Sequence, residues 1–241
     1  MQTSKEELER IMKVYKNRER KELLNLYTYF NRGNLFIIQD REKKLLDLLD
    51  KYGMNPLDNK KIFDIGCGSG GWLRDLLQYG AKPENLYGIE LLHDRFEKAN
   101  YLCPNMNITQ GNAVKIEYDD EMFDIVLQST VFTSIMDYEI KKRIAIEMLR
   151  VLSKDGIILW YDFRYNNPNN PDVSGIKKRE IKELFPECDY EFKTVTLLPP
   201  LVRKLAKISW LTCFLLNMIT FLRTHYFAVI RKRNYVNEDR E

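Results

Sequence analysis

The sequence is poor in the residues that build metal and redox sites. Of its 241 residues, four are cysteines and two are histidines. The cysteines are scattered, and no two have the spacing of a zinc or redox motif. This pattern predicts a reduced, cytoplasmic chain without a metal, and it argues against metal-assisted catalysis.

Long hydrophobic runs and a strong excess of one charge are also missing. The most apolar window, Ile208–Leu222, is shorter than the roughly 20 residues of a membrane-spanning helix, and it predicts a buried or interfacial helix instead. The opening residues, MQTSKEELER, lack the apolar core of a signal peptide, which argues against export. The formal net charge of +3 is too mild for a typical nucleic-acid-binding domain.

The chain opens with segments of helical character. Apolar and aromatic residues recur at helical intervals in the first 32 residues, which predicts one or two helices ending near Gly33. A further helix is predicted over Asp40–Tyr52, with a stop at Gly53. We interpret residues 1–55 as a helical cap on a domain that spans residues 56–241.

From residue 60 onward, short apolar runs alternate with amphipathic segments. The predicted strands are Lys61–Ile65, Leu86–Ile89, Met106–Thr109, Phe123–Leu127, Gly156–Tyr161, Glu191–Leu198 and Tyr226–Ile230. The predicted helices are Gly70–Tyr79, Arg95–Leu102, Tyr138–Leu152, Lys177–Phe185 and Val202–Leu222. Strands that alternate with helices indicate an α/β fold whose mainly parallel sheet is covered on both faces.

A glycine-rich turn follows the first predicted strand, in the sequence KIFDIGCGSGGWL. Glycines let the backbone turn tightly and leave room for a ligand against the chain. Because Gly66, Gly68 and Gly71 also satisfy the dinucleotide-binding fingerprint, glycine spacing alone does not identify the cofactor.

Polar side chains near the ends of the first three predicted strands narrow the choice of cofactor. Asp64 lies two residues before the first glycine, where a carboxylate can meet an amino group. Glu90 ends the second strand, where two oxygens can accept both hydroxyls of a ribose. Asn112 follows the third strand and can bond an adenine edge. Together they predict a site for an adenosine that bears an amino acid.

The ordered motifs resemble those of the class I S-adenosylmethionine-dependent methyltransferases. DIGCGSG is similar to the first motif of that family, YGIE to the second, QGNA to the third and FDIVLQST to the fourth. The segment from Arg150 to Trp160 resembles the family's approach to the fifth strand. The resemblance covers about Lys60 to Lys232. It implies a Rossmann-like, seven-stranded sheet with an antiparallel last strand, and here a helical insertion at 199–224 precedes that strand.

The resemblance also implies which residues hold S-adenosylmethionine and its product, S-adenosylhomocysteine. Asp64 and the glycines would line the methionine portion, Glu90 the ribose, and Asn112 the adenine. Leu91 and Ala113 would flank the adenine ring, and Gln128 would lie beside the sulfonium. The predicted cofactor-binding set is Asp64, Gly66, Cys67, Gly68, Gly70, Glu90, Leu91, Asn112, Ala113 and Gln128. Cys67 replaces a common small or apolar residue of the family, and we expect it to pack.

An alcohol acceptor would require a base near the reacting atoms. Candidate residues lie after the fourth and fifth strands and in the appended segments. They are His225, Asp162, Arg164 and Tyr27, with Tyr161 beside them. For His225 the preferred interpretation is a hydrogen-bonded histidine at the start of a strand, with the base as the alternative, and Asp162 and Arg164 could simply pair with each other.

The segments that we expect to face the methyl acceptor are rich in polar groups. Asparagines, tyrosines and Arg164 follow the fifth strand within Trp160–Ile176, which suits a sugar, although asparagine and proline also serve turns. From Phe192 to Asn237 no residue is acidic and several are basic. Together with the apolar helix, this segment could attract a phosphorylated or lipid-linked acceptor or an anionic membrane face. A lid over the cleft is the alternative.

We therefore predict methyl transfer to an oxygen of a sugar, a glycan precursor or another small molecule. The loop that follows the fifth predicted strand and the C-terminal segments resemble those of methyltransferases found with bacterial polysaccharide or glycolipid assembly enzymes. The alternatives are a lipid-linked, phosphorylated or protein acceptor, a nicotinamide-binding oxidoreductase, and a non-catalytic cofactor-binding protein. Nucleic acid is not an expected partner, because the fourth strand ends in Gln128-Ser-Thr-Val rather than in a base-methylating tetrad.

Overall fold

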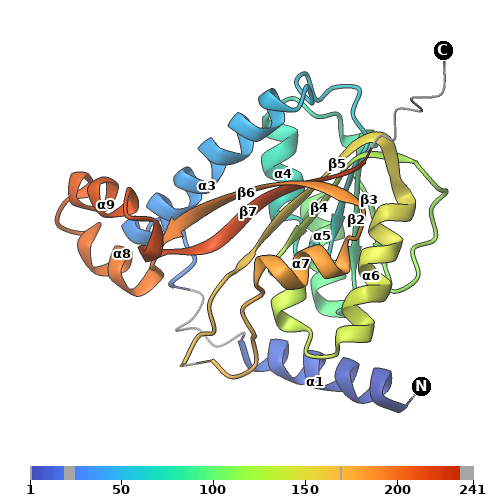
Figure 1. Cartoon of the computed structure of the whole chain (residues 1–241), viewed down its shortest axis with the longest axis horizontal. Coiled ribbons are helices and arrows are strands. Elements are labelled where there is room, and N and C mark those ends of the chain that lie inside the picture. Colours follow the sequence, from blue (N-terminus) through green and yellow to red (C-terminus); the bar gives the residue numbers. More distant parts are fainter. Residues whose placement is uncertain (1, 19–24, 169, 234–241) are drawn as a thin grey trace.

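The computed structural model describes residues 2–18, 25–168 and 170–233. Its centre is a seven-stranded sheet with the order β3-β2-β1-β4-β5-β7-β6 (Figure 1). The strands are β1 (Ile62–Ile65), β2 (Leu86–Glu90), β3 (Asn107–Gln110), β4 (Phe123–Ser129), β5 (Leu152–Phe163), β6 (Cys188–Leu197) and β7 (Arg223–Lys232). β7 runs antiparallel to both β5 and β6, and the other pairs are parallel. The predicted fold is confirmed.

Helices lie on both faces of this sheet (Figure 1). The α-helices are α1 (Gln2–Arg18), α3 (Arg32–Lys51), α4 (Gly71–Gln78), α5 (His93–Leu102), α6 (Tyr138–Val151), α7 (Lys178–Leu184), α8 (Pro199–Leu205) and α9 (Trp210–Asn217). The 3-10 helices are η1 (Pro83–Asn85), η2 (Phe132–Ser134) and η3 (Thr220–Leu222).

Two apolar cores, one on each face, hold the sheet. Every residue of β1 is buried, as expected for a strand that is covered on both sides. Phe63 contributes to the core that includes residues of α6, and Ile62 to the core that includes residues of α3 and α4. Because the parallel strands all end at one edge, the loops after β1, β2 and β4 meet there, which is where α/β sheets bind ligands.

The predicted boundary at Gly33 is wrong. Gly33 lies in the first turn of α3, which begins eight residues before the predicted Asp40. Asn31 is the N-cap, and its side chain accepts hydrogen bonds from the amides of Gly33 and Asn34. An added Cβ on Gly33 would lie 2.6 Å from Cα of Arg203, so this glycine serves close packing of α3 on α8. Part of the region predicted to be helical, residues 19–24, lies outside the described residues.

The predicted long helix over Val202–Leu222 is also wrong. The segment forms two short helices, α8 and α9, and Ser209 caps the second by accepting a bond from the amide of Thr212. Only one side of α9 is covered, because Cys213 joins a small core with Phe36 of α3 whereas Leu211 and Leu215 are exposed. Within the described residues, no helix is long and apolar enough to cross a membrane.

Candidate functional site

The glycine loop after β1 has a backbone that only glycine adopts readily. Gly66, Gly68 and Gly70 have φ angles of +65°, +58° and +76°, a region that disfavours residues with a Cβ. A Cβ on Gly66 would lie 2.7 Å from Val131, and one on Gly70 would lie 2.6 Å from the sulfur of Cys103. The loop is therefore fixed in shape.

Glu90 fastens this loop to the second strand. One of its carboxylate oxygens accepts a bond from the amide of Gly68 at 2.8 Å, and the other accepts one from the amide of Leu92 at 2.9 Å. The side chain is buried. Each oxygen keeps a further lone pair, so that Glu90 can shape the loop and still accept bonds from ribose hydroxyls.

Asp64 and Gln128 carry the clearest sign of a missing ligand. Both side chains are buried, and oxygen Oδ2 of Asp64 and nitrogen Nε2 of Gln128 have no hydrogen-bond partner. They lie on adjacent strands, but Gln128 of β4 is paired with Ile65 of β1 and not with Asp64, so the two side chains project to opposite faces of the sheet. A buried polar atom without a partner is costly. The free oxygen of Asp64, at the strand end next to the glycine loop, suits a ligand that carries an ammonium.

The charge state of Asp64 agrees with this picture. Burial, and the nearby carboxylate of Glu90, raise the pKa of Asp64 well above its ordinary value. An ammonium group bound at Asp64 would oppose both effects, because an opposite charge favours the ionised carboxylate. Binding of a cation at Asp64 would therefore lower the pKa of this carboxyl and release its proton.

The other predicted cofactor residues line the loops after β1, β2 and β3. The side chain of Cys67 is buried and packs against Gly88, which is the packing role expected of it, so it can offer a ligand only its backbone. Oxygen Oδ1 of Asn112 accepts a bond from the amide of Val114 and so orders the turn after β3. Leu91 and Ala113 are partly buried against the main core. Their roles at the adenine stay predictions.

Helix α1 closes over the same edge of the sheet. The carboxylate of Glu7 accepts a bond from the amide of Met136 at 2.6 Å, and Arg10 donates to the carbonyl of Ser134 at 2.5 Å. Arg10 and Glu7 also bind each other at 2.7 Å. The burial of Glu7 opposes its ionisation, but its bonds from Arg10 and Met136 outweigh that effect and lower its pKa.

Arg95 and Tyr15 form a layer between α1 and the glycine loop. The guanidinium of Arg95 lies 4.3 Å from the ring centre of Tyr15, within cation–π range. A nitrogen of Arg95 would also lie 3.9 Å from a Cβ on Gly68. The hydroxyl of Tyr15 is 3.0 Å from the hydroxyl of Ser134. Sequence reasoning missed Glu7, Arg10, Arg95 and Cys103, because nothing in their local pattern indicates that they meet the loop.

The structure does not bring the four predicted catalytic residues together. His225 is only 4% exposed and is stacked on Tyr161 at 4.7 Å between ring centres. Burial and the nearby charge of Arg41 lower its pKa to about 3, so that the imidazole is neutral. Asp162, in contrast, joins residues of the opposite face of the sheet. This geometry favours the packing interpretation of His225 over its use as a base.

Asp162 is held by its own neighbours. Its carboxylate accepts bonds from the hydroxyl of Thr133 at 2.5 Å and from the amides of Thr133 and Phe163. Burial raises its pKa to about 7 against these bonds. Asp162 thus ties η2 to β5, and it does not pair with Arg164.

Arg164 and Tyr27 lie further out. Arg164 donates to the hydroxyl of Tyr165 at 2.6 Å and to the carbonyl of Thr220. Tyr27 is exposed, and its ring faces the guanidinium of Arg203 at 5.5 Å. Both could meet an acceptor at the rim, whereas neither is joined to the glycine loop by a described contact.

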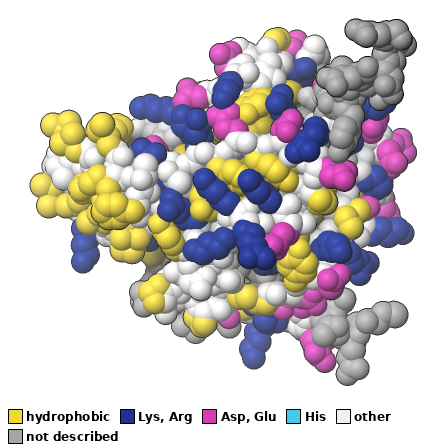
Figure 2. Space-filling model, viewed as in Figure 1, with side chains coloured by type: hydrophobic (Ala, Val, Ile, Leu, Met, Phe, Trp, Pro, Cys, Tyr) yellow, Lys and Arg dark blue, Asp and Glu magenta, His cyan; other side chains and the backbone are white. Residues whose placement is uncertain are grey.

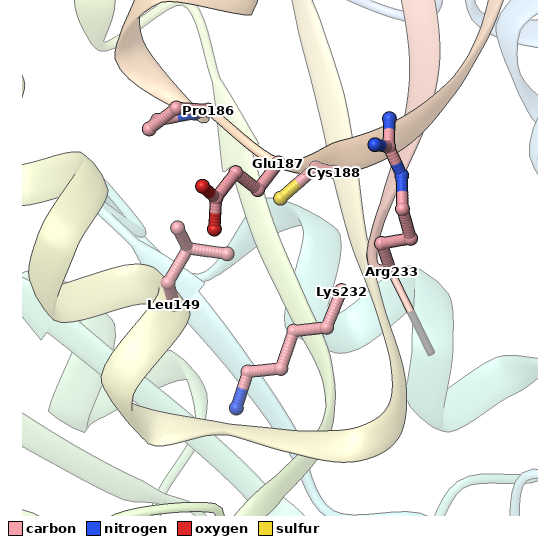
Figure 3. Close-up of a pocket in the computed structure, with 6 residues that line it drawn as sticks. All are labelled: Leu149, Pro186, Glu187, Cys188, Lys232 and Arg233. Atoms are coloured by element: carbon pink, nitrogen blue, oxygen red, sulfur yellow. The ribbon is translucent and has the colours of Figure 1, made fainter. Parts of the chain in front are cut away.

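One pocket of the described residues lies away from this site. It has a volume of about 240 Å³ and is lined by Leu149, Pro186, Glu187, Cys188, Lys232 and Arg233 (Figure 3). These residues lie where α6 ends, β6 begins and β7 ends, at the sheet edge opposite the glycine loop. This pocket is thus separate from the candidate site. Within the described ranges, no group of three or more His, Cys, Asp or Glu side chains could hold a metal ion.

Comparison with known sequences agrees with this site. Residues 63–160 match the family described as "Methyltransferase domain". An uncharacterized protein of Haemophilus influenzae is 32% identical over 127 residues, which are 50% of this chain and 49% of that protein. Phthiotriol/phenolphthiotriol dimycocerosates methyltransferase of Mycobacterium tuberculosis is 28% identical over 46% of this chain and 40% of its own length.

Norajmaline N-methyltransferase of Rauvolfia serpentina is 29% identical over 62% of this chain and 50% of its own length. The chain therefore spans about half the length, or less, of these curated relatives.

Comparison with solved structures supports the same fold. A SAM-dependent methyltransferase structure from Methanosarcina mazei superposes with a TM-score of 0.57 at 16% identity, over 78% of this chain and 98% of that one. A [4+2]-cyclase superposes with a TM-score of 0.58 at 14% identity, over 78% and 80%, so the fold alone does not define the reaction. With the motifs and the matched family, however, the class is defined: the chain carries a class I S-adenosylmethionine-dependent methyltransferase domain.

Proposed function

We propose that this chain transfers a methyl group from S-adenosylmethionine to an oxygen of its acceptor. The observation that carries the proposal is the buried, unpartnered oxygen of Asp64 beside a glycine loop of fixed shape. When bound, the cofactor supplies an electrophilic methyl group on a positively charged sulfur. Asp64 would hold its ammonium and Glu90 its ribose, and Gln128 would lie beside the sulfonium.

The chain's own residues would mainly position the reactants and keep out water. Alignment of donor and acceptor accounts for much of the rate in such reactions. The layer of Arg95 and Tyr15 under α1 covers Gly68, and a cover of this kind excludes solvent. Because Asp162 and His225 are buried and engaged, we expect the proton of a hydroxyl acceptor to leave by the open rim near Arg164.

For the acceptor, we propose a hydroxylated head group attached to a lipid. The polar segment after β5 favours a sugar or glycan precursor, although Asn166 and Asn170 bind amides of their own loop at Gly175 and Asp172. Arg164 and Tyr165, which bond each other, lie on that rim and could exchange this bond for one to an acceptor. The lipid part is supported by the exposed apolar residues of α9. An acceptor that is both glycan-like and lipid-linked satisfies the two observations.

Isotope-labelled methyl donor tests this function. The full chain is incubated with labelled S-adenosylmethionine and with separate aqueous and lipid extracts of cells, and the labelled products are identified by mass spectrometry. We expect label on an oxygen of a lipid-extract product, and a loss of at least tenfold in Glu90→Ala. Glu97→Ala, which removes an exposed carboxylate on α5, is the control. Label confined to protein, or cofactor binding without any labelled product, would contradict the proposal.

A further inference from the structure

A continuous apolar surface covers the outer side of the α8–α9 hairpin. In α9, Leu211, Leu215 and Met218 follow one another at helical spacing, with Phe214 between them. Such a stripe normally faces a protein core. Here the opposite side of α9 fills that role, because Cys213 packs with Phe36 and Val202. The ring of Phe214, at the border between the two sides, also lies 5.0 Å from the ring of Phe36.

We call the exposed side the α9 surface. It comprises Ile208, Leu211, Phe214, Leu215, Met218 and Phe221, whose exposed fractions lie between 45% and 84%. Figure 2 shows these apolar side chains gathered at the end of the molecule where α8 and α9 protrude. Isolated apolar residues are common on protein surfaces, but a gathered cluster of this kind marks an interaction site.

Cations border the α9 surface. Lys204 and Lys207 are exposed at the end of α8, and the amino group of Lys43 lies 5.5 Å from the ring of Phe214. Arg32 donates to the carbonyl of Lys207. Asp40 of α3 also lies in this packing, and its two oxygens are engaged by the amide of Thr196 and the side chain of Asn217.

Aromatic side chains lie next to this border. The turn before α3 contacts α8 through Arg203, which faces the ring of Tyr27 at 5.5 Å. In the same turn Tyr29 is exposed, and Phe30 is almost fully exposed. An apolar stripe with flanking cations and tyrosines is the pattern of helices that lie in the interface of an anionic bilayer.

We propose that the α9 surface docks the protein on a bilayer that contains anionic lipid. The eight residues of α9 span about 12 Å at 1.5 Å per residue, so the helix lies in the interface and does not cross it. The hairpin follows the end of β6 and precedes β7, at the sheet edge that carries the glycine loop. Docking by α9 therefore brings that edge to the membrane, and the lipid acceptor, which rests on the proposed function, could reach it.

Vesicle flotation tests this docking without any methyl donor. The full chain is mixed with vesicles of phosphatidylcholine, alone or with phosphatidylglycerol. We expect flotation with the anionic vesicles and a loss of at least tenfold in Leu211→Gln/Leu215→Gln/Met218→Gln. Tyr101→Gln/Ile146→Gln, which changes exposed apolar residues on α5 and α6, should float like the unaltered chain. Lys204→Gln/Lys207→Gln should weaken flotation on anionic vesicles and reduce its dependence on salt.

Three results would overturn the docking. The first is no flotation of the unaltered chain on either vesicle. The second is equal flotation of the triple variant. The third is that the unaltered chain is a dimer and does not bind vesicles, whereas the triple variant is a monomer. The α9 surface would then pair two copies of the chain. Calorimetry with S-adenosylhomocysteine on the triple variant separates failure of the docking from failure of the proposed function. Unchanged affinity shows that the cofactor site is intact, regardless of the flotation result.

Discussion

At the scale of single residues, the cofactor side of the site was more predictable than the catalytic side. Asp64, the loop glycines and Glu90 lie at strand ends, so their order along the chain largely determines where they meet. The catalytic candidates depended instead on the direction in which strand residues point. Asp162 and Phe163 are neighbours in sequence, yet Asp162 binds Thr133 on one face and Phe163 contacts His225 on the other. Alternation along a strand separates them.

Asp64 should couple cofactor binding to proton release. Its pKa is raised in the free protein by burial and by Glu90, and a bound ammonium would favour the ionised form. The protein that binds the cofactor must therefore give up a proton below the raised pKa, so affinity should fall as pH falls through that range. Calorimetry with S-adenosylhomocysteine in two buffers of different ionisation enthalpy measures the proton directly.

In Asp64→Asn we expect at least a tenfold loss of affinity and no released proton. Asp58→Asn, which alters an exposed side chain, should retain both. Equal proton release in the Asp64 variant and the unaltered chain would contradict this assignment.

Asp162 should make stability depend on pH. Burial raises its pKa to about 7 in the folded state, compared with about 4 in an unfolded chain. Between these values the folded state holds a proton that the unfolded state has lost, so the free energy of unfolding falls as pH rises from about 4 to 7. Denaturant titrations between pH 4 and 7 should show that the free energy of unfolding depends less on pH in Asp162→Asn than in the unaltered chain. Asp58→Asn is again the control. A parallel shift of the whole curve would argue against titration of Asp162.

At the scale of whole elements, the strands were predicted with small errors at their ends. The start of α3 and the division between α8 and α9 were not predicted. The start of α3 was missed because Asn31 and Gly33 were interpreted as a stop, although asparagine is a strong N-cap and Gly33 makes room for Arg203. The division of α8 from α9 was missed because the segment is apolar throughout. Which face of α9 is exposed becomes evident only when its packing against Phe36 is known.

Helix α1 should be held mainly by Glu7. Removing this carboxylate in Glu7→Ala takes away the ion-pair partner of Arg10 and leaves the amide of Met136 without a partner, which should cost about 1–3 kcal/mol of local stability. Hydrogen exchange should become faster in α1 and in residues 134–136, with little change in β1 and β4. Glu9→Ala removes an exposed carboxylate from the same helix and should leave exchange unchanged. If exchange in the central strands rises equally, α1 is not an independently docked cover.

At the scale of the whole molecule, the cofactor site draws on parts that are distant in sequence. Asp64 and Gln128 come from β1 and β4, and Glu90 joins β2 to the glycine loop. Tyr15, from α1, lies above them through Arg95. A ligand that engages all of these groups binds only the folded chain, so it must raise the stability of the domain as a unit.

S-adenosylhomocysteine should therefore raise the melting temperature of the chain, and NAD should not. At a ligand concentration of 100 times Kd, binding adds about 2.7 kcal/mol to the free energy of unfolding. For a domain of this size, 1 kcal/mol corresponds to about 2–4 °C, so we expect a rise of about 5–10 °C in calorimetry or fluorescence melting. Glu90→Ala should lose most of this rise, because its carboxylate shapes the loop and, in the proposed site, would bind the ribose. Glu97→Ala should keep it. A rise produced by NAD instead would assign the glycine loop to a dinucleotide, and the methyl-transfer assignment would be withdrawn.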